Sequence, residues 1–284
     1  MCTDAAGKCV AALLGGEGNL SLSSFVASVS PGTRSGLDFL FAAGGQSQNP
    51  ATGAPWGHLD PAGKGATLGM YGGALARPPS TCVELANMPL PQGIPVPDQL
   101  FENTVSGWPS GTAGPHLGLA LSEEFFNYAL ASVYDSGLLC LGVTAATVPD
   151  AAAFLNTKSF QTFFGIQGLE HLGLQDEVAS IAVVLRPGAP PHAEFGEGTA
   201  AEPLVSIALP DLAVDFYVWS LDRFVRFMTL TYDVNLGLDL VALPEGLTPT
   251  LTLFQLEHGE ASNLVWVQPS SVHPDTIAEF VQST

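Results

Sequence analysis

The sequence contains few basic residues: 8 Lys and Arg stand against 27 Asp and Glu, which gives a formal net charge of -19. Proteins that bind nucleic acid neutralise phosphates with clustered Lys and Arg, and no such cluster occurs here. The same shortage argues against binding anionic lipid headgroups through a basic tip. We therefore expect no nucleic-acid partner, and we interpret the surplus carboxylates as a solvated surface that favours solubility.

Cysteine is also scarce, and the residues Cys2, Cys9, Cys82 and Cys140 contain no Cys-x-x-Cys pair. No histidines lie at zinc spacing from them, so the sequence predicts no metal site and no cofactor. Disulfides can form, but the spacing leaves their pairing open. The low lysine content, together with 31 Gly and 22 Pro, is typical of an extracytoplasmic protein rich in β-strands.

Neither an export signal nor a membrane-spanning segment is evident. The first residues, Met-Cys-Thr-Asp, lack both a basic start and an apolar run. No uninterrupted apolar stretch reaches about 18 residues. We expect an extracytoplasmic protein, secreted or periplasmic, whose signal has been removed, or a fragment of a longer chain.

No catalytic motif is present. The closest text to a nucleophile elbow, at 107–111, has the wrong spacing, and the six histidines are scattered. The alternating Asp233, Asn235 and Asp239 would suit calcium ligands, but the Val and Leu between them favour the wet face of a strand. The sequence therefore predicts that the protein is not an enzyme.

The strongest pattern is strict alternation from Met228 to Leu240, which predicts one long β-strand of about 43 Å. The apolar face consists of Met228, Leu230, Tyr232, Val234, Leu236, Leu238 and Leu240. The polar face consists of Thr229, Thr231, Asp233, Asn235, Gly237 and Asp239. A register slip of one residue would bury the polar face, and each buried polar group without a partner typically costs about 1–3 kcal/mol. The sequence therefore specifies which face of the strand is inside.

Further strands are predicted around this one, at 178–185, 204–209, 212–219, 224–241 and 247–256. Within 212–219, alternation places Phe216 and Val218 inward with Leu212 and Val214, and Asp211 and Asp215 outward. The polar segment 257–260 is expected at a hairpin tip. Shorter strands are expected at 37–41 and 66–75.

A helix is predicted between Ser122, a suitable N-cap, and Gly137, a suitable stop. At 100° per residue, one face carries Phe126, Ala129, Leu130, Val133 and Tyr134, and the opposite face carries Asn127, Ala131 and Asp135. A shorter helix is expected from Asp150, and another from Pro274 to Val281. These elements suggest a remnant of a preceding β-rich domain or central sheet at 1–75, a Pro/Gly-rich linker at 76–114 and a main domain at 115–284.

The stretch from His116 to Leu141 resembles the start of the C-terminal domain in the bactericidal/permeability-increasing protein family, which belongs to the tubular lipid-binding superfamily. The matching pieces are Leu121-Ser122, Phe125-Phe126-Asn127 and Val133-Tyr134-Asp135-Ser136-Gly137-Leu138. Looser matches follow at 155–160 and at Pro190-Pro191-His192. The resemblance implies an α+β fold in which an elongated, highly twisted antiparallel sheet wraps around a long helix, here incomplete at both ends.

This resemblance also implies a function, which is the binding or transfer of phospholipid or fatty acyl chains in an apolar groove, with transient membrane contact. The expected lipid-binding residues are Phe126, Ala129, Leu130, Val133, Tyr134, Met228, Leu230, Val234, Leu236 and Leu238. The alternative is a structural or surface adhesion protein with the same fold and a filled core. The oligomeric state is not predicted by any pattern.

Overall fold

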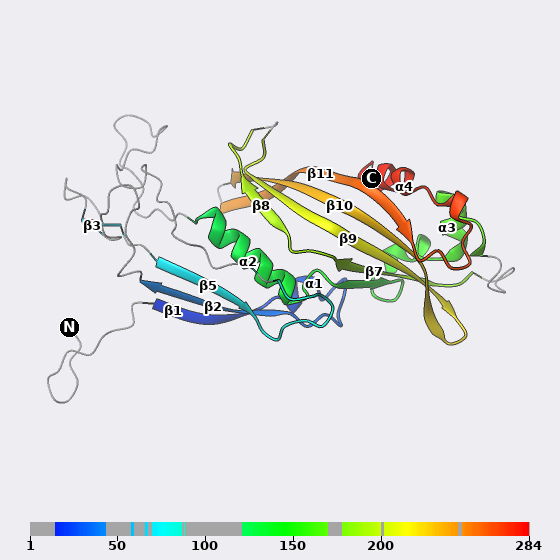
Figure 1. The fold of residues 1–284 in the computed structure, drawn as a ribbon, viewed down its shortest axis with the longest axis horizontal. Coiled ribbons are helices and arrows are strands. Elements are labelled where there is room, and N and C mark those ends of the chain that lie inside the picture. Colours follow the sequence, from blue (N-terminus) through cyan, green and yellow to red (C-terminus); the bar gives the residue numbers. More distant parts are fainter. Residues whose placement is uncertain are drawn as a thin grey trace. The chain divides into compact units, whose positions relative to one another are not determined.

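The computed structural model describes residues 15–43, 58–59, 66–67, 70–86, 88, 121–169, 178–199, 202–243 and 246–283. The chain forms an α+β fold with antiparallel sheets and few helices, as predicted (Figure 1). It divides into two compact units, each described here by itself. The first contains 1–20, 38–75 and 88–129, and the second contains 21–37, 76–87 and 130–284. Within the described ranges, no helix is long and apolar enough to cross a membrane.

The first unit is built on a three-stranded sheet in the order β1-β2-β5, whose strands are Gly15–Ser21, Gly36–Ala43 and Met70–Ala76. The short strands β3 (His58–Leu59) and β4 (Ala66–Thr67) pair separately. The strand predicted at 37–41 is confirmed, whereas the one predicted at 66–75 is divided between β4 and β5. Gly72 on β5 lies so close to the ring of Phe125 that any side chain there would collide with it.

Helix α2 (Glu123–Asp135) has the predicted limits. The N–H of Phe125 donates to Ser122 Oγ at 3.1 Å, which makes Ser122 the N-cap, and Gly137 ends the helix at φ 73°. The prediction of one buried face was wrong. Asn127 and Ala131, placed on the outer face, are buried.

Two segments that are distant in sequence contact the end of α2 within the second unit. Ser35 Oγ lies 2.6 Å from Ser136 Oγ, and the N–H of Ala86 donates to Asp135 Oδ1 at 2.6 Å. The small side chain of Ser136 lets Ser35 approach this end of the helix closely. Periodicity within the helix does not contain this information, because the covering segments are distant in sequence.

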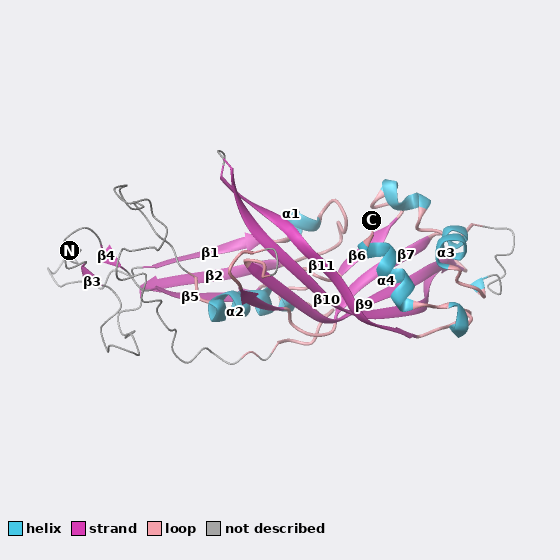
Figure 2. Cartoon of the chain, turned by 90° about the horizontal axis from the view of Figure 1, so that it is seen from above, coloured by secondary structure: helices cyan, strands magenta, loops and turns pink. Residues whose placement is uncertain are grey.

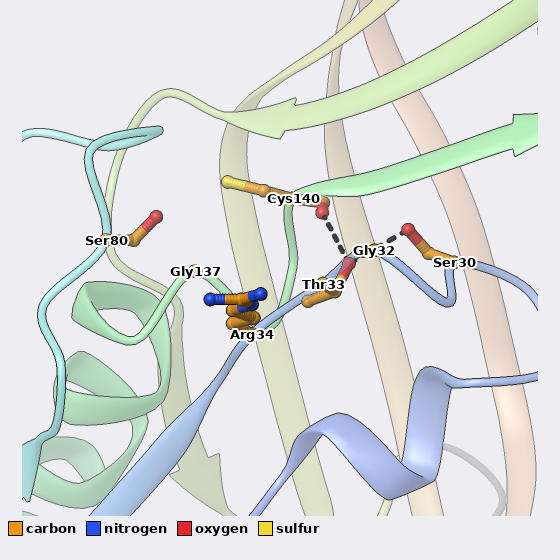
Figure 3. A pocket seen from close by; sticks show the side chains of 7 residues that line it. All are labelled: Ser30, Gly32, Thr33, Arg34, Ser80, Gly137 and Cys140. Carbon is orange, nitrogen blue, oxygen red and sulfur yellow. Dashed lines mark hydrogen bonds between the residues drawn. The ribbon is translucent and has the colours of Figure 1, made fainter.

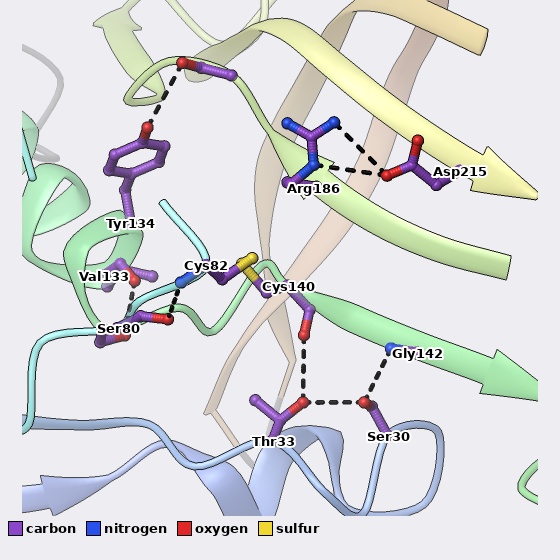
Figure 4. Close-up of a disulfide and its surroundings, with 12 residues drawn as sticks. Ser30, Thr33, Ser80, Cys82, Val133, Tyr134, Cys140, Gly142, Arg186 and Asp215 are labelled. Atoms are coloured by element: carbon purple, nitrogen blue, oxygen red, sulfur yellow. Dashed lines mark hydrogen bonds and ion pairs between the residues drawn. A yellow bond between two sulfur atoms is a disulfide. The ribbon is translucent and has the colours of Figure 1, made fainter. Parts of the chain in front are cut away.

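A disulfide joins Cys82 to Cys140, 58 residues later, just before β6 (Figure 4). Next to it, the N–H of Gly142 donates to Ser30 Oγ at 3.0 Å, and Thr33 Oγ1 donates to the carbonyl of Cys140 at 3.3 Å. The disulfide therefore lies where three separate segments of the second unit meet. The domain limits at 76, 114 and 115 stay predictions, since 89–120 lies outside the described residues.

The second unit contains an antiparallel sheet in the order β11-β10-β9-β7-β6, with β8 paired to β9. The strands are β6 Leu141–Thr144, β7 Ile181–Pro187, β8 His192–Phe195, β9 Val205–Ser220, β10 Arg223–Leu243 and β11 Gly246–Ser262. The long strand is confirmed and reaches 21 residues. The strands predicted at 204–209 and 212–219 are one strand of 16 residues, with a bulge where Asp211 has φ 53°.

The polar segment 257–260 is not a hairpin tip, contrary to the prediction. It lies within β11, where Glu257 pairs with Asp233 and Glu260 pairs with Thr231. A bulge at His258, whose φ is 52°, accommodates the interruption of the apolar pattern. The polar residues 257–260 therefore indicate a bulge within the strand. The chain reverses between β10 and β11 near Leu243 and Gly246.

Helices α3 (Thr157–Phe164) and α4 (Pro274–Gln282) lie side by side at one end of this sheet (Figures 1 and 2). The helix expected from Asp150 is a 3-10 turn, Pro149–Ala153, and α3 begins afterwards because Asn156 Oδ1 accepts the N–H of Ser159 at 2.9 Å. Helix α4 is confirmed. Phe160 of α3 lies with its ring centroid 5.3 Å from that of Phe216, so this end of the sheet has an aromatic core.

The disulfide makes the first testable prediction. We expect Cys82→Ser to lower the free energy of unfolding by about 2–4 kcal/mol, because the crosslink restricts a long loop in the unfolded chain. Urea denaturation measures this difference, and Thr81→Ser, a neighbouring exposed substitution, is the control, with an expected change within about 0.5 kcal/mol. Equal midpoints for wild type and Cys82→Ser would contradict the assignment.

Candidate lipid-binding surface

The apolar face of β10 has two halves with different surroundings. In the first half, Met228, Leu230, Tyr232 and Val234 are at most 5% exposed. They belong to a buried cluster with Phe160, Ile166, Leu169, Ile181, Phe216, Val218 and Phe227. This half is a filled core, so three predicted lipid-binding residues, Met228, Leu230 and Val234, are enclosed by protein side chains.

The second half begins after Val234 and is open. Leu236 and Leu238 are half-buried, and Leu240 is 49% exposed. Residues directly opposite one another on antiparallel strands share a face. The apolar surface at Leu238 therefore includes its neighbours Val205 on β9 and Leu251 on β11. We call this surface the open strip. Its residues are Phe195, Val205, Ile207, Leu209, Leu236, Leu238, Leu240, Leu251, Phe254 and Leu256.

The open strip is continuous with the filled core, because Leu209, Leu236 and Leu256 pack against the edge of the buried cluster. From Leu236 to Leu240 it extends along β10 for about 13 Å at roughly 3.3 Å per residue. All ten of its residues are half-buried or exposed. An apolar surface of this size exceeds what isolated exposed side chains produce, and such surfaces are typical of interaction sites.

The reverse face of the same strands carries polar residues, and the chain itself covers it around Gly237 and Asp239. The N–H of Leu204 donates to Asp239 Oδ1 at 2.8 Å. Gly237 lies against Pro203 and Leu253, either of which a Cβ would approach to 2.7 Å. The segment before β9 therefore covers the polar face, whereas α3 and α4 cover only the first half of the apolar face.

Two groups near the boundary between the halves have shifted pKa values. The backbone N–H of Asp211, followed by the side chain of His258, lowers the pKa of Asp233. Burial, followed by the charge of Asp275, raises the pKa of Tyr232 to about 12. The Tyr232 hydroxyl donates to the carbonyl of Pro274 at 2.9 Å, which attaches α4 to the sheet.

Asp215 was predicted to point outward, and it does lie on the face of β9 opposite Val214 and Phe216, yet it is only 2% exposed. Its carboxylate accepts the hydroxyl of Thr229 at 2.5 Å and pairs with Arg226 at 3.3 Å. It also pairs with Arg186 at 3.5 Å (Figure 4). Phe227 is the extra residue of a bulge on β10, and this bulge decides which residues of β10 lie beside Asp215. Alternation along β9 alone therefore does not predict these partners. A buried carboxylate requires such pairing, because removal of one partner would leave an uncompensated charge in the sheet.

A polar cavity of about 300 Å³ lies at the end of α2, lined by Ser30, Gly32, Thr33, Arg34, Ser80, Gly137 and Cys140 (Figure 3). Within it, Thr33 Oγ1 lies 2.8 Å from Ser30 Oγ. A second cavity of about 180 Å³ is lined by Ala208, Leu209, Pro210, Asp233, Val234, Asn235 and Glu257. Neither is suited to an acyl chain, because the first is lined by polar groups and the second is smaller than typical ligand pockets of roughly 300–1,000 Å³.

The predicted helix residues are distributed over both units. Phe126 and Ala129 are half-buried in the first unit, and Leu130 and Val133 are half-buried in the second. Tyr134 is buried, and its hydroxyl donates to the carbonyl of Gly188 at 3.5 Å. Burial, then the charges of Asp135 and Glu84, raises its pKa. Tyr134 is outside the buried cluster around β10, so a common surface of helix and strand stays a prediction.

Comparison with known proteins adds no relative: no protein-family model matches the chain, and no curated protein sequence matches it. The resemblance at 116–141 depends on those residues alone.

The pKa of Tyr232 makes a prediction about alkaline stability. The folded-state pKa lies above the ordinary value of 10.0, so the folded protein keeps this proton longer than the unfolded chain does. The contribution is fully present below pH 10 and decreases as the pH rises towards about 12. We expect Tyr232→Phe to unfold more easily at neutral pH, by about 1 kcal/mol for the lost hydrogen bond.

Urea denaturation between neutral pH and the alkaline limit of folding measures both effects. The wild type is expected to lose stability more steeply than Tyr232→Phe above pH 10. Parallel curves for the two proteins would show that this hydroxyl is not the titrating group.

Proposed function

We propose that this protein binds lipid on the open strip and holds acyl chains by apolar burial, without catalysis. The observation that supports this most strongly is the continuous aliphatic surface from β9, β10 and β11, which is half-exposed beside a filled core. Acyl chains require no specific polar partner, and aliphatic side chains provide the surface that excludes water from them. Release of a chain to a membrane makes transfer the accompanying function.

The magnitude of the apolar effect is sufficient for such binding. Each buried methylene contributes about 0.8 kcal/mol, so a chain that buries about ten methylenes gains up to about 8 kcal/mol. Part of this gain offsets the lost freedom of the bound lipid, which is estimated at about 4 kcal/mol or more. The net affinity falls in a range compatible with reversible transfer.

The proposal includes the finer fold assignment, a tubular lipid-binding type in which a twisted sheet wraps around a helix. Support comes from the half-buried state of Leu130 and Val133, which leaves apolar area on α2 for a ligand. Phe126, Ala129 and Tyr134 belong to the same predicted lining. We also propose an extracytoplasmic location, supported by the Cys82–Cys140 disulfide, since disulfides persist in oxidising compartments.

A structural or adhesion protein with a filled core is the second candidate, and one observation favours it. The rings of Phe160, Phe216 and Phe227 lie 5.3–6.3 Å apart and fill the first half of the sheet completely. If the open strip is covered in the same way, no acyl chain can enter. The two candidates therefore differ in whether lipid occupies the strip.

Native mass spectrometry of the purified protein, with extraction of what co-purifies, tests the proposal. We expect stoichiometric phospholipid or fatty acid on the wild type. Leu238→Glu is expected to reduce it at least tenfold, because a charge on the strip resists contact with methylenes. Gln255→Glu, which adds the same charge from an exposed position near Asn235 on the reverse face, is the matched control and should retain lipid.

Circular dichroism and a thermal midpoint for each variant establish that the fold is retained. A folded wild type that is lipid-free and also refuses added lipid would favour the filled-core candidate. Equal lipid content in Leu238→Glu and the wild type would place the ligand elsewhere.

A further inference from the structure

The turn between β9 and β10 carries an unusual residue. Ser220 pairs with Arg223, so the loop contains only Leu221 and Asp222, whose φ angles are 51° and 58°. This is the geometry of a type I′ turn, for which Asn-Gly is strongly favoured. Leucine has no conformational advantage at such a position, and Leu221 is nevertheless 85% exposed. Neither turn geometry nor core packing explains it.

The hairpin also projects beyond both neighbouring strands. On one side, β7 begins at Ile181, opposite Val218, and on the other side β11 ends at Ser262, opposite Thr229. The turn therefore extends past the last paired residue of each neighbour, as the yellow loop at the lower right of Figure 1 shows. Leu221 therefore lies at the end of a projecting hairpin, where it is accessible to an approaching surface.

Other exposed apolar side chains surround this turn. The rings of Trp219 and Phe224 lie 5.0 Å apart, edge to face, at its base. The N–H of Trp219 donates to the carbonyl of Ser180 at 2.9 Å, which brings Val178 to the same end. Ser180 also forms a bridge with Asn156, next to the Phe154–Phe163 ring pair. We call this group the apolar tip: Phe154, Phe163, Val178, Trp219, Leu221 and Phe224, each at least 41% exposed.

The apolar tip differs from the rest of the chain in its charge. Its segments, 154–163, 178–181 and 219–224, contain the basic residues Lys158 and Arg223 and the acidic residue Asp222. These described segments are nearly neutral, whereas the whole chain has a net charge of -19. A nearly neutral, aromatic end can enter a phospholipid headgroup layer without the desolvation cost that the carboxylates of the acidic surface would incur.

We infer that the apolar tip docks on the surface of a phospholipid bilayer, with Leu221 entering the acyl boundary and Trp219 at headgroup level. Tryptophan is enriched at this depth because its ring is apolar and its N–H is polar. A zwitterionic bilayer fits best, since the tip has no basic cluster. The docking surface is at the opposite end of β9 and β10 from the open strip, and it does not depend on lipid being bound there.

Flotation with phosphatidylcholine vesicles tests this inference. Leu221→Asn suits the type I′ turn, so the variant is expected to keep its fold while partition to vesicles falls about tenfold or more. Leu85→Asn removes an exposed leucine outside the tip and is expected to float like the wild type. Quenching by brominated acyl chains should be weaker in Trp219→Phe than in the wild type.

Two results would overturn the inference: a wild type that does not float, or a Leu221→Asn variant that floats equally well. A wild type that forms dimers in sedimentation velocity, dissociated by Leu221→Asn and indifferent to vesicles, would assign the tip to a second copy of the chain. The Leu238→Glu variant is expected to float normally. Its loss of bound lipid with retained flotation separates the strip from the tip.

Discussion

The antiparallel pairing of β9 with β10 is the interaction on which the second unit depends. It extends from Arg223 opposite Ser220 to Leu238 opposite Val205, and it decides which side chains share a face. A slip of one residue would exchange the apolar face of β10 for its Asp and Asn residues, which cannot be buried without partners. Two bulges interrupt this pairing. The bulge at Phe227 shifts the inward positions of β10 from Val225, opposite Val218, to Met228, opposite Phe216, whereas the second bulge lies on β9 and keeps the apolar face from Met228 onward.

The apolar face of β10 has the same alternating sequence along its length, but helices cover only part of it, so its two halves have different surroundings. At the hairpin end, the helices α3 and α4 supply Phe160, Phe164 and Phe280, and the core is closed. At the other end, Leu238 and Leu240 have the same strand partners but no covering helix among the described elements. The difference lies in where the helices dock, and the strand sequence itself is apolar throughout.

Local patterns predicted the long strand, α2 with its Ser122 cap, and α4, because alternation, capping and helix periodicity are properties of neighbouring residues. They did not predict what depends on distant partners. Asp215 is buried because Arg186 and Thr229 reach it from other strands, and the end of α2 is contacted by Ser35 and Ala86, which are distant in sequence. Prediction of the open strip would have required the register of β9 and β11 against β10. Bulges shift that register, and their positions could not be predicted from the sequence.

Leucine in a type I′ turn and a row of exposed leucines and phenylalanines on β10 and β11 are both departures from what stability alone favours. Polar residues in the strip, or Asn at Leu221, would satisfy the same backbone at less risk of aggregation. Such local inconsistencies are expected where function constrains the sequence. The turn belongs to the hairpin of β9 and β10, and the row lies on β10 and β11 at the opposite end of the same sheet. The buried Asp215 pairs with arginines between them. A stiff sheet that is stabilised at its middle can therefore present an apolar surface at each end.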